Sequence, residues 1–433
     1  MFDRQKKGER ALLLVPHQRG EGDPVRRTAE FAELARSAGA DVVSIIPASI
    51  KTPDPRYYVG SGKAEEVAQA ASSSTADVVL VDRQLSPVQE RNLEKLINVR
   101  VIDRAGLILD IFAQRARSAE GKLEVELAQL RHLATRLVRG WTHLDAQRGG
   151  AIGNRGPGET QLETDRRLLG ERVKMLGKRL LKVQTQRGQQ RRLRLRTSVP
   201  RVALVGYTNA GKSTLFNALT TGQVFTADLL FATLDPTVRK LDGLACGPAV
   251  LADTVGFIRE LPHDLVAAFR ATLAEARDAD LLLHVSDASD EDRGPLQRVV
   301  DQVLVEIGAA DVPQLQVMNK IDLAGGEPRL DRDAHGRPQR VWLSAATGAG
   351  LQLLRTALGE LLGGERFRAK LQLPLSAGRL HAQLRASGAI AQESVDEQGW
   401  QLQIDAPRSL LEPLAGGDAA GAHLLRALLA PAS

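Results

Sequence analysis

One segment of the chain has the residue types and spacing of a phosphate-binding loop. Residues 206–213 read GYTNAGKS and fit the pattern G-x-x-x-x-G-K-[ST]. Glycines let backbone N–H groups approach a chain of phosphates closely. The lysine neutralises the charge of the phosphates, and the hydroxyl coordinates Mg²⁺. We therefore expect Lys212 to contact the phosphates and Ser213 to bind the metal. The residues expected in this loop are Gly206, Tyr207, Thr208, Asn209, Ala210, Gly211, Lys212, Ser213 and Thr214.

A second pattern, DTVG at 253–256, follows the apolar run AVLA. An acid at the end of a strand can hold Mg²⁺ through a water molecule, and the N–H of a flexible glycine can sense a γ-phosphate. We expect Asp253 to take the first role and Gly256 the second, with Thr254 and Val255 also in the nucleotide site.

A threonine that senses the γ-phosphate is expected in FATLDPT, residues 231–237. We choose Thr233 for contact with both the γ-phosphate and Mg²⁺, which places it with Lys212 and Gly256 among the predicted catalytic residues. Thr226 and Thr237 remain alternatives, because position alone does not decide among the three.

The motif NKID at 319–322 predicts which base is bound. The carboxylate of Asp322 can accept hydrogen bonds from N1–H and N2–H₂ of guanine, whereas adenine offers no such pair of donors. Lys320 can lay its stem along the base plane. The predicted nucleotides are GTP and GDP; a small-molecule P-loop kinase is the alternative, but it does not need N-K-x-D. The residues expected around the base are Asn319, Lys320, Asp322, Ser344, Ala345 and Ala346.

The residue after Gly256 is Phe257, where many GTPases carry the glutamine that orients the attacking water. A phenylalanine cannot orient water by hydrogen bonding, so hydrolysis needs help from a cation, another loop or a partner. The side-chain oxygen of Asn209 could hold K⁺ against the phosphates. The alternative is that Asn209 is a turn residue that tolerates an unusual φ.

These motifs lie at the ends of apolar runs that have the length of strands. Strands are predicted at 201–206, 249–254, 280–287, 314–320 and 340–345, with helical stretches between them. Strands that alternate with helices indicate a doubly wound parallel sheet, which binds ligands at the carboxyl ends of its strands. The predicted domain is a P-loop GTPase domain over 199–365.

Residues 1–110 alternate in the same way, with apolar runs at 11–15, 41–46, 77–82 and 100–103. They predict a second parallel α/β domain. Its segment VGSGK, at 59–63, resembles a shortened phosphate loop but lacks the full spacing. We favour a turn that caps a helix over a second nucleotide site. After the GTPase domain, the tail 366–433 predicts a small α+β domain with a hairpin around residues 396–399.

The stretch 111–198 predicts an antiparallel helical hairpin. Apolar residues repeat with steps of four and three in two separate segments, from Leu123 to Leu137 and from Leu169 to Val183. A glycine-rich tip at 140–160 joins them. Residues 111–196 hold 20 basic and 8 acidic side chains, which points to a polyanionic partner; a solvated helix face is the alternative. The RNA contacts expected at the tip are Arg148, Gly149, Gly150, Asn154 and Arg155.

Composition narrows the class of protein. The 433 residues are 43% hydrophobic and 25% charged, as in ordinary globular proteins, and the single Cys246 cannot close a disulfide within the chain. No apolar stretch has the roughly 18 residues that span a bilayer. We expect a cytoplasmic monomer without a membrane span.

The motifs together resemble the HflX family of ribosome-associated GTPases. GYTNAGKST (206–214), FATLDPT (231–237), DTVGFI (253–258) and NKID (319–322) carry the resemblance, and GNRGPGETQLETDRR (153–167) is a further family signature. The resemblance implies GTP hydrolysis stimulated by the large ribosomal subunit, binding of its rRNA near the peptidyl-transferase region, and splitting of stalled 70S ribosomes. The alternative function is a GTP-switched assembly or rRNA-binding factor with negligible turnover alone.

Overall fold

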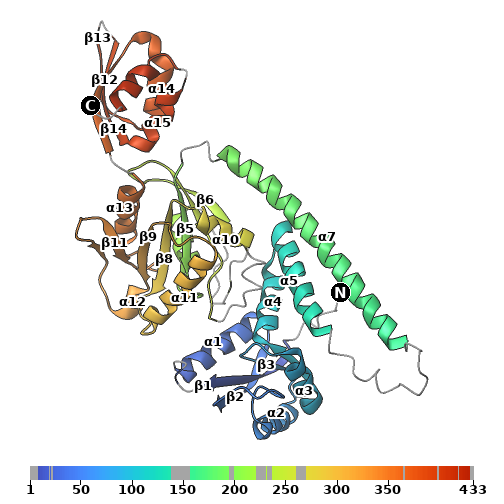
Figure 1. Ribbon diagram of the computed structural model, residues 1–433. Coiled ribbons are helices and arrows are strands. Elements are labelled where there is room, and N and C mark those ends of the chain that lie inside the picture. Colours follow the sequence, from blue (N-terminus) through green and yellow to red (C-terminus); the bar gives the residue numbers. More distant parts are fainter. Residues whose placement is uncertain are drawn as a thin grey trace. The chain divides into compact units, whose positions relative to one another are not determined.

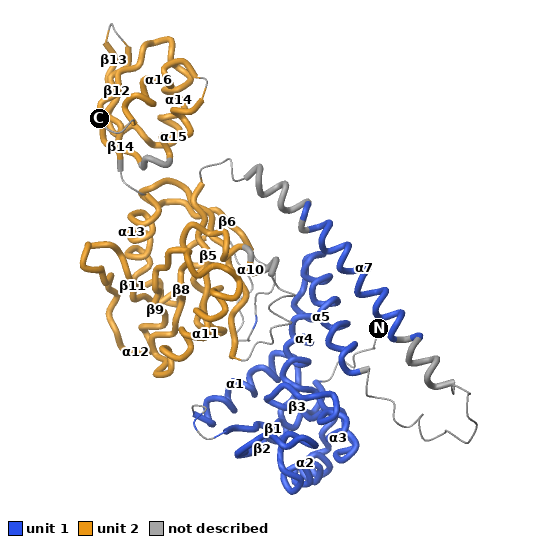
Figure 2. Tube along the Cα trace, in the orientation of Figure 1, with its two compact units in different colours: residues 1–187, 227–235, 260–272 blue, residues 188–226, 236–259, 273–433 orange. Residues whose placement is uncertain are grey.

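The computed structural model describes residues 8–18, 20, 23–137, 157–194, 199–220, 231, 237–259, 270–363, 366–396, 399–417 and 419–429. The chain divides into two compact units (Figure 2). Unit 1 comprises residues 1–187, 227–235 and 260–272, and unit 2 comprises residues 188–226, 236–259 and 273–433. No helix in the described ranges is long and apolar enough to cross a membrane.

Unit 1 contains a four-stranded parallel sheet in the order β2-β1-β3-β4, as the alternation of strands and helices predicts (Figure 1). Its strands are β1 (Arg10–Gln18), β2 (Asp41–Ile50), β3 (Val78–Val81) and β4 (Arg100–Asp103). The helices that follow them are α1 (Pro24–Ser37), α2 (Ser61–Ser73), α3 (Pro87–Ile97) and α4 (Arg104–Arg115). The start of α3 is set by a capping box, in which Ser86 and Gln89 exchange side-chain-to-backbone hydrogen bonds.

Two long helices, α5 (Ala119–Leu137) and α7 (Pro157–Arg194), run in opposite directions, and α5 lies beside the part of α7 that belongs to unit 1 (Figure 1). Leu127, Leu176 and Leu180 are buried between them, and they belong to the predicted seams. Arg172 of α7 also bonds Glu126 of α5, with 2.6 Å between Nη2 and Oε1. The helical hairpin is therefore closed by the repeat of leucines seen in the sequence.

Unit 2 contains a seven-stranded sheet in the order β10-β11-β9-β8-β5-β7-β6. Its strands are β5 (Arg201–Gly206), β6 (Thr237–Leu241), β7 (Ala249–Asp253), β8 (Leu281–Asp287), β9 (Gln314–Asn319), β10 (Arg329–Arg332) and β11 (Pro338–Trp342). The five inner strands are parallel, as predicted. The two antiparallel edge strands, β6 and β10, are additions that the strand–helix alternation did not indicate, because they are short and partly exposed.

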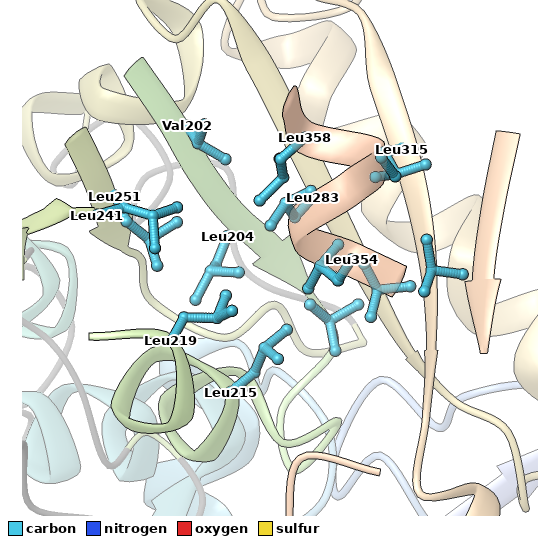
Figure 3. Close-up of a cluster of buried hydrophobic side chains, with 14 of the residues drawn as sticks. Val202, Leu204, Leu215, Leu219, Leu241, Leu251, Leu283, Leu315, Leu354 and Leu358 are labelled. Atoms are coloured by element: carbon cyan, nitrogen blue, oxygen red, sulfur yellow. The ribbon is translucent and has the colours of Figure 1, made fainter. Parts of the chain in front are cut away.

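Helices cover the sheet of unit 2 on both faces. They are α8 (Lys212–Leu219), α10 (Arg270–Arg277), α11 (Arg293–Glu306), the short α12 (Ile321–Ala324) and α13 (Leu351–Leu362). Figure 3 shows the core under α8 and α13, where Leu215, Leu219, Leu354 and Leu358 meet side chains of the central strands. Strands buried on both faces explain the near-continuous apolar runs of the sequence.

The tail of the chain has an apolar core of its own, built on a three-stranded antiparallel sheet in the order β12-β14-β13. Its elements are β12 (Arg366–Leu373), the 3-10 turn η1 (Leu375–Ala377), α14 (Gly378–Ala386), β13 (Ile390–Asp396), β14 (Gly399–Pro407), α15 (Arg408–Gly416) and α16 (Ala422–Leu429). The predicted hairpin is present between β13 and β14. The α+β class expected for this region is confirmed.

Candidate nucleotide-binding site

The turn between β5 and α8 needs glycine at two positions. Gly206 has φ +148°, and a Cβ there would lie 2.2 Å from the carbonyl oxygen of Val285. Gly211 has φ +89°, and a Cβ there would lie 2.2 Å from the amide nitrogen of Asn319. Side chains cannot occupy either position without moving backbone or a buried amide. The phosphate-loop pattern therefore corresponds to a tight turn from the sheet into the first turn of a helix.

Lys212 is buried at the start of α8, with 6% of its surface exposed. Its ammonium donates hydrogen bonds to the carbonyl oxygens of Gly206 (3.0 Å) and Tyr207 (2.7 Å). Burial lowers the pKa of Lys212 to about 8, although the charge of Asp253 opposes that shift. A positive charge in this position, surrounded by the turn, suits the binding of a phosphate.

The hydroxyl of Ser213, in the first turn of α8, meets the carboxylate of Asp253, the last residue of β7. Ser213 Oγ donates to Asp253 Oδ2 at 2.8 Å, and Asp253 is fully buried at the end of β7. Hydroxyl and carboxylate oxygens are the ligands that Mg²⁺ prefers. No group of three or more His, Cys, Asp or Glu side chains within the described ranges could hold a metal alone. The pair fits a Mg²⁺ ion that Ser213 would bind directly and Asp253 through a water molecule, with further ligands from water and phosphate.

Gly256 lies directly against this cluster. A Cβ at Gly256 would lie 2.8 Å from Thr208 Cγ2 and 3.0 Å from Lys212 Nζ. The next residue, Phe257, is 2% exposed, and its main chain pairs with the phosphate loop: Thr208 N donates to Phe257 O and Phe257 N donates to Gly206 O. The Gly256 backbone therefore lies against Thr208 and Lys212 of the phosphate loop, and the ring of Phe257 is buried.

Asn319, expected near the base, connects three segments of the site. Its amide nitrogen donates to Ala210 O at 2.9 Å, and its amide oxygen accepts a hydrogen bond from Ala345 N at 2.9 Å. Ser344 is fully buried, and its hydroxyl accepts from Thr347 N at 3.2 Å. These contacts hold the phosphate loop next to residues 319 and 345, which belong to the segments predicted to bind the base.

Lys320 and Asp322 follow β9 with their side chains in different surroundings. Lys320 has a left-handed backbone, with φ +64°, and its ammonium lies 2.8 Å from Asp287 Oδ2. Asp322 is exposed in the first turn of α12, so its carboxylate is accessible to a base. Asp287 belongs to no motif of the sequence, in which it is only an acid at the end of a predicted strand.

Comparisons with known proteins agree with this geometry. A family described as "GTP-binding GTPase N-terminal" matches residues 26–113, one described as "GTP-binding GTPase Middle Region" matches 115–194, and one described as "50S ribosome-binding GTPase" matches 201–320. GTPase HflX of Escherichia coli is 57% identical over 409 residues, which cover 94% of this chain and 96% of the relative. The chain belongs to the HflX family of GTPases.

A second HflX relative, from Magnetococcus marinus, is 44% identical over 387 residues, 89% of each chain. A crystal structure of a GTP-binding protein from Sulfolobus solfataricus in complex with GDP matches at 24% identity and a TM-score of 0.44, over 82% of this chain and 98% of that chain. The HflX assignment, together with the P-loop domain, identifies the protein as a GTPase that hydrolyses GTP.

Several residues predicted for an HflX-type site lie outside the described residues. These are Thr226, Thr233, Arg148, Gly149, Gly150, Asn154 and Arg155. Thr237 is described and lies on β6, where it pairs with Asp253 of β7. Phe231 is also described, and its ring packs edge-on against Phe112 of α4, with 4.7 Å between the ring centroids.

The phosphate-loop-like segment of the N-terminal region leads into α2 of this HflX protein. Gly60 is the N-cap of α2, and Lys63 pairs with Glu66 one turn later at 2.7 Å. The turn follows an isolated bridge between Asp54 and Tyr58 rather than the end of a sheet strand. The predicted turn at the start of a helix is present.

Proposed function

We propose that this GTPase docks on the rRNA of the large ribosomal subunit and uses GTP to split stalled 70S ribosomes. The observation that carries the proposal is the exposed basic surface of α7. Seven exposed cationic side chains lie on its described part: Arg166, Arg167, Arg172, Lys174, Lys178, Arg179 and Lys182. Only Arg167 and Arg172 have acidic partners among the described residues. The other five leave an excess of positive charge that suits a phosphate backbone.

We assign the nucleotide contacts to the residues that the sequence motifs predict. Lys212 neutralises the β- and γ-phosphates, and the N–H of Gly256 contacts the γ-phosphate. Thr233, outside the described residues, contacts the γ-phosphate as well. Asp322 recognises guanine, with Lys320 flanking the base plane. The proximity of Gly256 to Lys212 supports this division of roles.

Mg²⁺, when bound, neutralises phosphate charge and orients the phosphate oxygens. Ser213 would hold it through its hydroxyl, Asp253 through a water molecule, and Thr233 through a third contact. Asn209 would hold K⁺. Its backbone is left-handed, with φ +58°, and its side chain is exposed, so both the cation role and the turn role fit this position.

The cellular location, the oligomeric state and the domain division are also part of the proposal. A factor that acts on ribosomes works in the cytoplasm, and we propose that it acts there as a monomer. We also propose four domains, 1–110, 111–198, 199–365 and 366–433. Separate buried apolar clusters in the first, third and fourth regions, and the leucine seam in the second, support this division.

Sedimentation through a sucrose gradient tests the proposal. Purified 70S ribosomes are incubated with the protein and a non-hydrolysable GTP analogue, and the GTPase rate is measured with and without large subunits. Splitting predicts separate 30S and 50S peaks and a rate stimulated by large subunits. Intact 70S peaks with binding only to 50S precursors would instead support an assembly factor. Absence of binding to any ribosomal particle would contradict the proposal.

A further inference from the structure

The loop after β8 makes a defined contact with the base-binding motif. Asp287 ends β8, and both of its carboxylate oxygens have partners. Oδ2 lies 2.8 Å from the ammonium of Lys320, and Oδ1 accepts hydrogen bonds from Ser289 N (2.9 Å) and Ser289 Oγ (2.6 Å). The carboxylate is therefore held by its own loop on one side and by the lysine on the other.

The main chains of the two loops are also joined. Asp287 and Asn319 are register partners at the ends of β8 and β9, and Ala288 N donates to Asn319 O at 2.7 Å. This bond holds the main chain of Asp287 next to that of the residue before Lys320. The ion pair is itself sheltered, since the side chains of Lys320 and Asp287 are only 24% and 22% exposed.

Lys320 needs such a constraint for its proposed role. A lysine side chain is long and flexible, so holding it in one conformation costs rotamer entropy. Its backbone is left-handed, a conformation that non-glycine residues retain where the surroundings impose it. A lysine whose ammonium is anchored at its far end presents its methylene stem as a fixed apolar surface.

We propose that Asp287 is a positioning residue for guanine nucleotides. It anchors the ammonium of Lys320, so that the stem lies against the base plane while Asp322 binds the edge of the base. The inference rests on the proposed role of Lys320 at the base and extends it to a residue that does not touch the nucleotide. Ser289 helps to position Lys320 because its N–H and hydroxyl orient the carboxylate of Asp287.

Equilibrium binding of a fluorescent GDP analogue to the full chain tests the proposal. The variants are Asp287→Asn, Lys320→Ala and the double variant, with Glu291→Gln of the same loop as a control for loss of charge. Glu291 is exposed. Asp287→Asn keeps the size of the side chain but loses the ion pair, so we expect GDP to bind about three- to tenfold more weakly. In the Lys320→Ala background the same change should have no further effect.

Two further measurements separate positioning from a general loss of structure. The KM for GTP should rise in Asp287→Asn while kcat at saturating GTP stays unchanged, and the melting temperature without nucleotide should stay within about 2 °C of the wild type. The preference for GDP over xanthosine diphosphate should also be unchanged, because Asp322 sets it.

The outcomes distinguish this inference from the proposed base site. Wild-type affinity in Asp287→Asn, or an effect that adds fully to that of Lys320→Ala, would overturn the role of Asp287 alone. Wild-type affinity in Lys320→Ala would overturn the role of Lys320 at the base, and the role of Asp287 with it. Weaker binding in both single variants without additivity supports the proposal.

Discussion

Thr208 and Phe257 are joined through their main chains, with 2.8 Å between Thr208 N and Phe257 O. The phenol oxygen of Tyr207 adds a second connection, since it accepts a hydrogen bond from Arg259 N at 3.0 Å. The phosphate loop and the segment after β7 therefore form one hydrogen-bonded unit. Within it the Phe257 side chain is buried, with 2% of its surface exposed.

This burial predicts that glutamine at position 257 does not restore catalysis. Phe257→Gln should leave the intrinsic GTPase rate within about threefold of the wild type, because the side chain points into the core. It should also destabilise the domain by about 2–4 kcal/mol, since an apolar ring is replaced by a buried amide. Single-turnover hydrolysis and denaturant unfolding measure the two effects. A rate increase of a hundredfold would show that residue 257 reaches the water.

A cation role for Asn209 predicts a dependence on the monovalent ion. The intrinsic GTPase rate should be several-fold higher in K⁺ than in Na⁺ at matched ionic strength, and Asn209→Ala should remove the difference. GDP affinity of the variant serves as the control for an intact loop. Equal rates in the two salts would leave Asn209 as a turn residue and the ribosome as the missing activator.

The exposed position of Asp322 allows a change of base specificity without loss of fold. Asp322→Asn should weaken GTP binding roughly a hundredfold, because two hydrogen bonds to a charged acceptor are lost, and should favour xanthosine triphosphate. Competition binding with the two nucleotides measures the change. Unaltered GTP affinity in this variant would show that the base is recognised elsewhere.

The lowered pKa of Lys212, about 8, predicts that nucleotide binding takes up protons. The phosphates bind the ammonium form of Lys212, so nucleotide binding raises the pKa of this residue. The affinity for the nucleotide should therefore fall as the pH rises above 8, by up to about tenfold per pH unit. Calorimetry at pH 8 in two buffers of different ionisation enthalpy detects the proton uptake. The Lys212→Arg variant keeps its charge at this pH, so it should bind the nucleotide without taking up a proton. Equal heats in both buffers for the wild type would contradict the assignment.

The basic helical hairpin predicts two separable contributions to ribosome binding. Replacement of residues 149–158 by a shorter Gly/Ser linker should leave GTP affinity intact and abolish large-subunit binding or its stimulation of the GTPase. Replacement of Lys174, Lys178 and Lys182 by glutamine should weaken binding and reduce its salt dependence. The control replaces exposed Glu171 with glutamine. If both hairpin variants bind as the wild type at physiological salt, the RNA-binding surface lies elsewhere.

The local requirements of the site were readable from the sequence. A loop around phosphates needs glycines, a metal needs oxygen ligands, and apolar runs followed by these motifs predict a parallel sheet with its ligands at one edge. The seams of α5 and α7 were readable for the same reason, because a helix repeats its buried face every three to four residues. Each of these patterns depends on residues close together in the chain.

Tertiary structure decided the contacts between segments that are far apart in the sequence. Asn319 bonds the phosphate loop through its amide, Asp287 pairs with Lys320, and the main chain of Phe257 pairs with residues about 50 positions earlier. The edge strands β6 and β10 likewise depend on a neighbouring strand for their hydrogen bonds. Such choices depend on which strands become neighbours, and no local spacing of residue types encodes that order.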